Sequence, residues 1–311
     1  MKKTFVRKIS EKAEIDPSVI LLTGDLGFGA FEEFAEKHPD NFLNVGIAEQ
    51  SMASIAAGLA LDGRRVFIYS LGNFPTLRCL EQLRNDICYN DLPITVVTNG
   101  GGMAYGYLGM SHHATEDISI LRALPGMTVT APADPMETER CFDYLYEKSS
   151  PGYLRLCRGG ERVLHSTLDK FDKPCLLPLN ICQKPDVMII MTGEIASAYE
   201  KIAVSLNDNG VSANIFSSPI IKPAPDFSEI FQHDYKLVIT VEENNYIGGL
   251  GGSVAEYLSQ LASHPRLLRI GLNDEYYKVA GNHDFMKDHA GLSVEKIVGR
   301  IVEKYTEVTE L

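Results

Sequence analysis

The sequence lacks any apolar run long enough to cross a membrane, which takes about 20 residues as a helix. Its first residues, Met1-Lys2-Lys3-Thr4, lead into no apolar segment of the kind that forms a secretory signal. These two absences argue against a membrane-spanning or secreted protein, so we expect a cytoplasmic one.

Positive charge is also scarce. The 311 residues include 29 Lys and Arg against 41 Asp and Glu, which gives a net charge of −12 at pH 7. An acidic chain is poorly suited to bind nucleic acid or an anionic membrane surface. An anionic substrate would therefore need a local cluster of Arg and His side chains.

The cysteines are few and follow no ligand pattern. The six of them, at positions 79, 88, 141, 157, 175 and 182, form no C-x-x-C pair and no His spacing typical of zinc sites. We expect reduced core residues and no metal site built by this chain. The sequence also lacks short repeats and low-complexity segments.

What the first half of the chain does contain is a regular alternation of strands and helices. Short apolar runs predict strands at 19–23, 42–45, 65–69, 93–98, 127–130 and 153–156, and helical patterns lie at 30–37, 77–89, 116–124 and 134–147. Asp134 is placed to cap the last helix, with Pro135 at its first position. This alternation predicts an α/β fold with a doubly wound, mainly parallel sheet.

A second alternating unit follows a stretch without periodicity. Pro174, Pro178 and Pro185 interrupt that stretch, which is typical of a linker. Strands are then predicted at 187–191, 212–216, 236–241 and 267–270, with helices at 195–207 and 253–262. We therefore predict two α/β domains, at 1–165 and 186–311, with a linker at 166–185.

One acidic residue stands where a strand leads into a small-residue helix. Glu49 lies in Asn44-Val45-Gly46-Ile47-Ala48-Glu49-Gln50 and precedes a segment too apolar to lie on a surface. The simplest interpretation is a charge that favours the helix N-terminus. Buried acids are rare without a partner, which supports that interpretation. The alternative is a functional carboxylate.

A glycine-rich stretch follows the strand at 93–98. Asn99 to Gly109 holds five glycines and two tyrosines, and Ser111-His112-His113 comes directly after it. Because parallel sheets bind ligands at the carboxyl ends of their strands, we expect His112 or His113 to serve acid–base chemistry or anion binding. The adjacent histidines are not i, i+4 neighbours and do not suit a metal. A flexible turn with solvated imidazoles is the alternative.

Two further segments carry candidate ligand groups. Arg158 lies at the carboxyl end of the strand at 153–156, where it could hold a phosphate or carboxylate or form an ordinary surface salt bridge. Gly248-Gly249-Leu250-Gly251-Gly252 lies between a strand and a helix but matches neither a P-loop nor G-x-G-x-x-G. We interpret these glycines as tight helix–sheet packing.

Taken in order, these motifs resemble one enzyme family. The segment Gly46-Ile47-Ala48-Glu49-Gln50, the glycine stretch ending in Ser111-His112-His113, Thr130-Ala131-Pro132-Ala133-Asp134 and Val241-Glu242-Glu243-Asn244 are similar to the C-terminal half of transketolases and deoxyxylulose-phosphate synthases. The similarity extends from about Val19 to about Lys304. It implies a pyrimidine-binding domain, a transketolase C-terminal domain and the cofactor thiamine diphosphate.

The resemblance implies a role for Glu49. The matching glutamate of the family hydrogen-bonds N1′ of the aminopyrimidine ring, because a carboxyl group in an apolar pocket can share a proton with a ring nitrogen. This contact favours the tautomer that removes the proton from the thiazolium C2. Glu49 would thus activate the cofactor, which itself performs the difficult step of the reaction.

The resemblance also implies roles around that carboxylate. Phe74 matches an aromatic residue that stacks on the pyrimidine, and Asp25 and Ile47 match residues lining the cofactor pocket. His112 matches a histidine near the thiazolium and the substrate, beside His113. Arg158 matches an arginine that binds the substrate phosphate.

Two departures from the family bear on the substrate. Leu108-Gly109-Met110 replaces an Asp-Gly-Pro tripeptide, and a further family histidine falls on Gly100 or Gly101. The missing groups normally contact sugar hydroxyls, and a site without such partners discriminates polyols poorly. We therefore expect a modified sugar or a less hydroxylated acceptor rather than an ordinary pentose phosphate.

A missing domain bears on the architecture. Family members hold the diphosphate through Mg²⁺ with a Gly-Asp-Gly and a distant Asn, and here only Gly24-Asp25-Leu26 comes near. The chain resembles the C-terminal subunit of a split transketolase, whose partner subunit supplies that domain and Mg²⁺ in a two-fold α2β2 assembly.

Two rival functions stay open at this point. One is the β subunit of a 2-oxo-acid dehydrogenase or of another acyloin-forming thiamine enzyme, and the other is a non-enzymatic scaffold. The sequence also leaves open whether Arg78 or Arg84 reaches the site.

Overall fold

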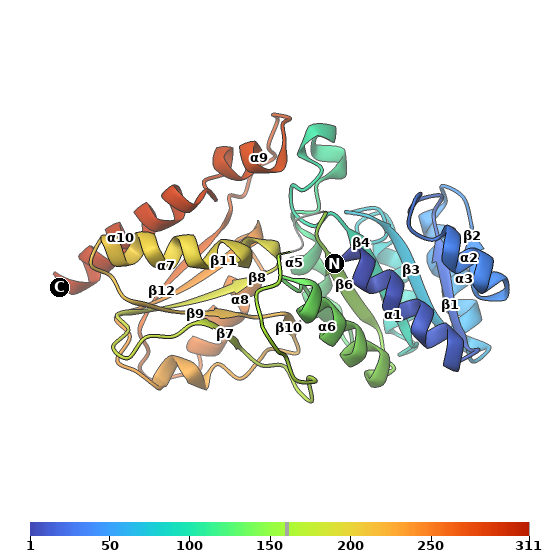
Figure 1. Ribbon diagram of the computed structural model, residues 1–311, viewed down its shortest axis with the longest axis horizontal. Coiled ribbons are helices and arrows are strands. Elements are labelled where there is room, and N and C mark those ends of the chain that lie inside the picture. The colour runs from blue at the N-terminus through green and yellow to red at the C-terminus, as the bar shows by residue number, and fades with distance from the viewer. Residues whose placement is uncertain (159–161, 311) are drawn as a thin grey trace.

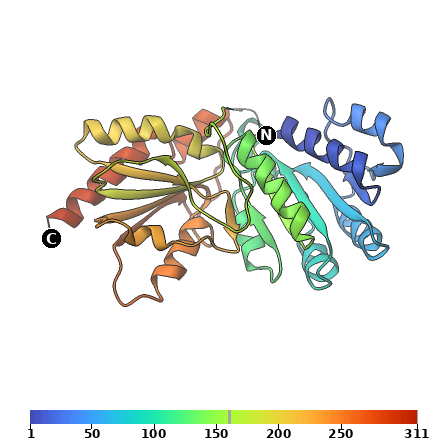
Figure 2. The ribbon, with the colours of Figure 1, turned by 60° about the horizontal axis from the view of Figure 1, so that its bottom comes forward.

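Two sheets with mainly parallel strands form the framework of the molecule in this computed structural model (Figure 1). The structure describes residues 1–158 and 162–310. The glycine-containing end of the Arg158 motif, at 159–161, lies outside these residues. Helices cover both faces of each sheet (Figure 2), so the predicted fold class of two doubly wound α/β domains is confirmed.

The first sheet has the strand order β10-β5-β6-β4-β3-β1-β2. Its strands are β1 (Val19–Thr23), β2 (Phe42–Asn44), β3 (Arg65–Leu71), β4 (Ile94–Asn99), β5 (Thr128–Thr130), β6 (Gly152–Leu156) and the antiparallel β10 (Ile220–Lys222). Every residue of β1, β4 and β6 is buried, as expected of central strands covered on both faces.

The helices of the first domain divide between the two faces of this sheet. They are α1 (Lys2–Ile15), α2 (Glu32–Lys37), α3 (Glu49–Leu61), α4 (Leu80–Gln82), α5 (Asp117–Ala123) and α6 (Pro135–Lys148), with short turns η1 (Pro39–Asn41), η2 (Leu83–Cys88), η3 (Gly106–Leu108) and η4 (Met110–His112). Phe5 of α1 and Phe142 of α6 share one core cluster, whereas Met52 of α3 and Ile118 of α5 belong to another. The sheet therefore separates two cores.

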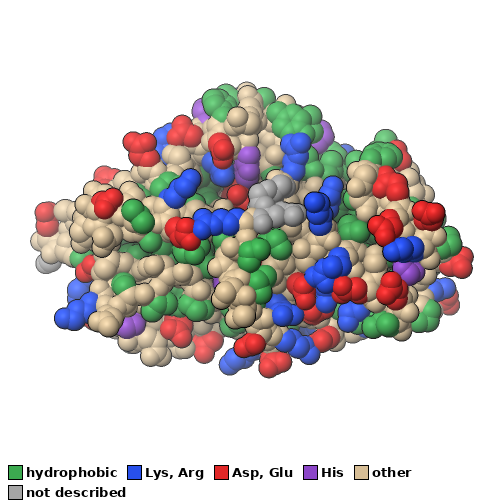
Figure 3. Space-filling view, viewed as in Figure 1, with side chains coloured by type: hydrophobic (Ala, Val, Ile, Leu, Met, Phe, Trp, Pro, Cys, Tyr) green, Lys and Arg blue, Asp and Glu red, His purple; other side chains and the backbone are tan. Residues whose placement is uncertain are grey.

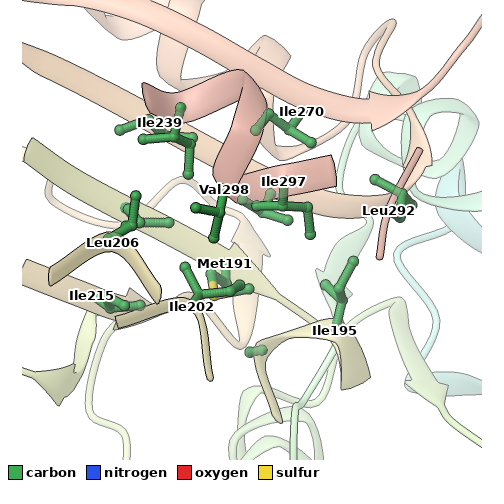
Figure 4. Packing of buried hydrophobic residues seen from close by; sticks show 14 of the residues in the cluster. Met191, Ile195, Ile202, Leu206, Ile215, Ile239, Ile270, Leu292, Ile297 and Val298 are labelled. Atoms are coloured by element: carbon green, nitrogen blue, oxygen red, sulfur yellow. The ribbon is translucent and has the colours of Figure 1, made fainter. Parts of the chain in front are cut away.

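The second sheet has the order β12-β11-β8-β9-β7. Its elements are β7 (Leu177–Asn180), β8 (Val187–Thr192), η5 (Glu194–Ala198), α7 (Tyr199–Asp208), β9 (Ala213–Ser217), η6 (Ser228–Phe231), β11 (Leu237–Asn245), α8 (Leu250–Leu258), β12 (Arg266–Leu272), α9 (His283–His289) and α10 (Val294–Thr309). Figure 4 shows Ile202 and Leu206 of α7 and Ile297 of α10 packed over the strands on one face. Val254 and Leu258 of α8 pack on the other.

Two strands of the structure lie where the sequence predicts none, and one of them joins the sheet of the other domain. The strand β10 lies in the second half of the chain but pairs with β5 of the first sheet. The strand β7 lies in the stretch predicted as linker, and it pairs antiparallel with β9 at the edge of the second sheet. An edge strand tolerates Pro178, which cannot donate a ladder hydrogen bond, and this explains the weak sequence signal.

The surface carries mixed charge. Figure 3 shows Asp and Glu side chains interspersed with Lys and Arg over one face of the molecule. Within the described residues, no helix combines the length and the apolarity that crossing a membrane requires.

Candidate functional site

The candidate site residues gather at the carboxyl ends of the parallel strands. Glu49 opens α3 just after β2, Phe74 follows β3, and His112 ends η4 in the segment after β4. We call residues 100–114 the Gly-rich loop. The structure thus brings together groups that are far apart in the sequence, at the sheet edge where open α/β folds bind ligands.

The Glu49 carboxylate is buried and faces side chains rather than its own helix. Glu49 is 2% exposed. Its Oε2 accepts a hydrogen bond from Nη1 of Arg78 at 2.6 Å, and its Oε1 accepts a longer one from the Ser70 hydroxyl at 3.4 Å. A Cβ on Gly24 would lie 3.5 Å from the carboxylate, in ordinary van der Waals contact, so Gly24 borders this pocket. The simpler interpretation of a helix-capping charge does not describe these contacts.

Arg78 links Glu49 to an aromatic pair. The guanidinium carbon of Arg78 lies 4.4 Å from the ring centroid of Phe74. The Phe74 ring meets the His112 ring edge-on, with centroids 5.2 Å apart and planes at 65°. A continuous line of contacts therefore runs from Glu49 through Arg78 and Phe74 to His112. Arg78, which the sequence left open as a site residue, thus reaches the site through its ion pair with Glu49.

Asp25 and Ile47 flank this line on neighbouring loops. Asp25 follows β1 with φ of 56°, in the left-handed region that most side chains avoid. Asn44 holds it there, because the Asn44 Oδ1 accepts the Asp25 N–H and the Asn44 amide donates to the Asp25 carboxylate. Ile47 is 78% exposed, and this large apolar side chain faces outward beside Glu49.

Arg158 lies against the aromatic residues of the Gly-rich loop. Its guanidinium carbon is 4.9 Å from the Tyr105 ring centroid and 4.8 Å from that of Tyr107. Stacking of this kind orients a guanidinium group while leaving its N–H donors free to bind an anion. Burial raises the pKa of Tyr105, which keeps its hydroxyl protonated as it accepts a hydrogen bond from Asn99.

His113 occupies a different environment from its neighbour. It is 3% exposed, and its Nε2 has no hydrogen-bond partner among the described residues. Burial lowers the pKa of His113, although the charge of Glu243 opposes that effect, so the ring favours its neutral form. The predicted part of His113 in substrate binding stays a prediction. Arg84, which the sequence left open as a site residue, donates a hydrogen bond to the side chain of the adjacent Asn85.

Sequence reasoning missed a network of buried charges behind the Gly-rich loop. Arg155 of β6 is buried and forms an ion pair with Asp117, and it also donates to the backbone oxygens of Ala114 and Glu243. The members of this network lie far apart in the chain. No local pattern marks such a network, because only the fold brings its members together.

One group of side chains within the described residues has the spacing of a metal site. It consists of Cys157, Glu194 and His283. However, His283 Nε2 lies 2.9 Å from Glu243, and the Lys287 ammonium lies 3.6 Å from Glu194. Burial also raises the pKa of the Cys157 thiol far above neutral pH, so the thiol is protonated, while Glu194 pairs with Lys287 and His283 with Glu243.

The glycines at 248–252 pack as the sequence predicts. Glu242 accepts hydrogen bonds from the backbone N–H groups of Leu250 and Gly251, each at 2.8 Å, at the start of α8. A Cβ on Gly249 would lie 1.9 Å from this carboxylate. The N–H groups at this helix N-terminus are thus satisfied by a side chain of the protein itself, whose pKa burial raises to about 7.

Comparison with known proteins decides the family. Residues 1–162 match the model of the transketolase pyrimidine-binding domain, and residues 179–297 match that of the transketolase C-terminal domain. The chain belongs to the transketolase family. This confirms the resemblance inferred from the motifs around Glu49 and His112.

Similar transketolase proteins have the same extent. A putative transketolase C-terminal section of Methanocaldococcus jannaschii is 34% identical, covering 98% of this chain and 96% of its own length. A protein of Phocaeicola vulgatus named as one subunit of an apulose-4-phosphate transketolase is 32% identical, covering 97% and 96%. A solved structure described as a split gene transketolase, inactive beta4 tetramer, has a TM-score of 0.84 and 29% identity, covering 98% of this chain and 97% of its own.

Membership of the transketolase family implies dependence on thiamine diphosphate, and the side chains here suit its pyrimidine ring. Glu49 offers a buried carboxylate, and Phe74 offers an aromatic face beside it. The planar Arg78 guanidinium already contacts both groups, so a flat, nitrogen-rich group fits between them.

Proposed function

We propose that this chain is the pyrimidine-binding subunit of a transketolase-type enzyme that transfers a two-carbon ketol unit between sugar-type substrates. The observation that carries the proposal is the buried Glu49 carboxylate, aligned with Phe74 and His112 at one sheet edge. A non-enzymatic scaffold has no need for a buried acid at this position, because burying a charge is costly even when it is paired, as Glu49 is with Arg78.

Glu49 holds the proton at N1′ of the cofactor ring in this proposal. When bound, thiamine diphosphate supplies the nucleophilic carbon that takes up the ketol unit. The chain itself orients the ring against Phe74 and fixes its tautomer through the carboxylate. Asp25 and Ile47 line the same pocket, and the outward-facing Ile47 side chain is available to a second polypeptide.

His112 and Arg158 act on the substrate in this proposal. The His112 imidazole, which leans edge-on against Phe74, moves protons at the substrate hydroxyl or carbonyl oxygen. Arg158 presents its guanidinium on two tyrosine rings and binds an anionic group of the substrate. His113 supports the same segment from a buried position.

Arg78 must leave before the cofactor can bind. Its guanidinium now makes the two contacts that we assign to the aminopyrimidine, one with Glu49 and one with Phe74. The Arg78 side chain is 44% exposed and therefore has room to turn toward solvent. In the free subunit Arg78 thus neutralises Glu49, and it yields that position when the holoenzyme forms.

A second, different polypeptide completes the enzyme. We infer that it supplies the diphosphate-binding domain with its Mg²⁺, because relatives that match this chain over almost their whole length are named as a transketolase C-terminal section and as one subunit of a transketolase. A site shared by two different chains favours a two-fold α2β2 assembly. The relative from Phocaeicola vulgatus, which is named as one subunit of a transketolase, supports the two-subunit arrangement.

The substrate is a modified sugar or an acceptor with few hydroxyl groups. Leu108, Gly109 and Met110 stand where hydroxyl-binding groups lie in ordinary transketolases, and Leu108 and Met110 are exposed apolar side chains. The relative that is named for apulose-4-phosphate supports this choice of an uncommon sugar.

The test compares the chain alone with the chain co-expressed with a diphosphate-binding subunit. We expect ketol transfer only from the complex, only with thiamine diphosphate and Mg²⁺, and fastest with deoxygenated or otherwise modified acceptors. Native mass spectrometry would show two copies of each chain. Robust activity of the lone chain, a preference for ordinary pentose phosphates, or reductive acylation of lipoamide would each contradict its part of the proposal.

A further inference from the structure

The Gly-rich loop is closed at its base, and His112 lies next to that base. Gly102 and Ala114 exchange backbone hydrogen bonds of 2.8 Å in both directions and so close the loop at its base. The turns η3 and η4 lie between them. Any group that fixes the base of this loop therefore also fixes His112, which lies two residues before Ala114.

The C-terminal domain contacts this loop at its base through a hydrogen bond and a buried side chain. The Oε1 of Glu243, in β11, accepts the backbone N–H of Met103 at 2.6 Å, although the two residues are 140 positions apart. The Met103 side chain is fully buried in the hydrophobic core of the C-terminal domain, together with Met286 of α9. A Cβ on Gly102 would lie 2.3 Å from the Glu243 carboxylate, so only glycine permits this approach.

The same domain also contacts the loop farther along. The N–H of Gly281 donates to the backbone oxygen of Gly106 at 3.3 Å, and Met286 packs where a Cβ on Gly106 would lie. Figure 1 shows α9 beside the turns of the Gly-rich loop at the top of the molecule. The contacts at Met103 and Gly106 therefore come from one surface of the C-terminal domain.

His283, the first residue of α9, also contacts Glu243. Its Nε2 lies 2.9 Å from both carboxylate oxygens of Glu243. The other charged or titratable groups around this pair are Lys287 of α9, Glu194 of η5, and Cys157, Arg155 and His113 of the first domain. Glu243 is thus a carboxylate shared between a cationic side chain of α9 and the backbone of the Gly-rich loop.

We propose that Glu243 is a positioning residue for the reaction: it holds the Gly-rich loop, and with it His112, in the geometry that the substrate needs. This inference rests on the proposed function, because it assigns to the C-terminal domain a part in the same site. Glu243 acts on the loop through its hydrogen bond with the Met103 N–H, and His283 balances the charge of the Glu243 carboxylate. This makes His283 of α9 and Glu243 of β11 part of the active-site support.

The pH dependence of this pair follows from its contacts. Burial alone would lower the pKa of His283, but the charge and hydrogen bond of Glu243 outweigh it and the pKa is raised. Burial would raise the pKa of Glu243, but His283 and the Met103 N–H lower it. The charged pair is therefore complete below the ordinary pKa of histidine and weakens as pH rises through the raised pKa of His283.

The decisive variant is Glu243→Gln, compared with Glu242→Gln as a matched control. Glu242 is the adjacent residue, is similarly buried, and also accepts backbone N–H bonds, but those come from α8 and not from the loop. In the holoenzyme complex, we expect Glu243→Gln to lower kcat about a hundredfold, the scale of a misplaced catalytic group, with a smaller change in KM. Glu242→Gln should leave kcat unchanged.

A readout independent of activity is hydrogen exchange at the Met103 amide. We expect this exchange to accelerate at least about tenfold in Glu243→Gln, since the charge-assisted bond is lost, and not in Glu242→Gln. If both variants lose kcat equally, or if Met103 exchange is unchanged in Glu243→Gln, the positioning role is wrong. A wild-type complex without ketol transfer would instead refute the proposed function.

A second variant covers the case in which Glu243→Gln fails to fold. His283→Gln keeps Glu243 and a hydrogen-bond donor but removes the titrating cation. In the wild-type complex, kcat should decline on the alkaline side as His283 loses its proton, and in His283→Gln that decline should disappear. An unchanged alkaline decline in His283→Gln would overturn the inference.

Discussion

At the scale of single residues, the site depends on the Glu49 carboxylate and the Arg78 cation beside it. Glu49 is 2% exposed, and Arg78 is the cationic partner that the structure provides for it. A buried charge without a partner destabilises a protein strongly, whereas removing both members of a pair costs much less. The free subunit therefore needs Arg78 for stability, although the cofactor needs Arg78 to leave.

We expect Arg78→Ala to destabilise the free chain by about 1 to 2 kcal/mol, less than for a fully buried pair because Arg78 is 44% exposed. In a chain that already carries Glu49→Gln, Arg78→Ala should leave the free energy of unfolding almost unchanged, because no buried charge is left unpaired. Chemical denaturation of the single and double variants measures this coupling. In the complex, Arg78→Ala should bind thiamine diphosphate more tightly than wild type.

Two results would contradict this picture. Additive stability effects of Arg78→Ala and Glu49→Gln would show that the ion pair does not couple the two residues. Weaker cofactor binding by Arg78→Ala would show that Arg78 stays in place beside the ring and holds Glu49 for it.

At the scale of elements, the sequence predicted most of the framework. The predicted strands and helices from 19 to 270 agree with the structure to within a few residues, because fully buried strands give short apolar runs with clear ends. The helix α6 begins as predicted, with Asp134 accepting the Glu137 N–H and Pro135 at the first position. Buried periodicity and caps are local properties, and a single sequence displays them.

Elements that depend on distant partners were not predicted. The strand β10 has three residues and exists because β5 pairs with it. The 7-residue helix α9 was not predicted either, and neither were the 14-residue α1 and the 16-residue α10, although these two each bury one face at helical spacing that their own sequences display. Short or edge elements are specified by tertiary contacts more than by their own sequence.

The end of the predicted first domain, at 164–165, is docked on α6. The Leu164 N–H donates to Asp134 at the start of α6, and the His165 Nε2 lies 2.9 Å from the Glu137 carboxylate. Burial would lower the pKa of His165, but the hydrogen bond and charge of Glu137 outweigh it, so the pKa is raised. This segment is thus tied to α6 by a bond that depends on the protonation of His165.

Stability should respond to pH through this bond. Because the folded pKa of His165 lies above its unfolded value, its contribution is complete below about pH 6.5 and is lost as pH rises through the folded pKa. We expect a loss of about 1 kcal/mol over that window. Denaturation midpoints of wild type and His165→Gln should converge as pH rises, and a constant difference between them would contradict the assignment.

At the scale of the whole molecule, the two domains act on one site. The first domain places Glu49, Phe74 and His112 at its strand ends, and the second inserts Glu243 behind the loop that carries His112. The sequence singled out Glu49 and His112 because each follows a predicted strand, whereas Phe74 was named only from the resemblance to the family. The sequence could not locate Glu243, since nothing local in β11 indicates which loop its carboxylate meets.

The central claim is that Glu49 activates thiamine diphosphate in a site that a second polypeptide completes. The most direct measurement is the rate at which the C2 proton of the bound cofactor exchanges with deuterium in the assembled complex. We predict fast exchange in wild type and, in Glu49→Gln, exchange slower by at least about a hundredfold, the usual contribution of a positioned acid–base group. Exchange in Glu49→Gln as fast as in wild type would contradict the account.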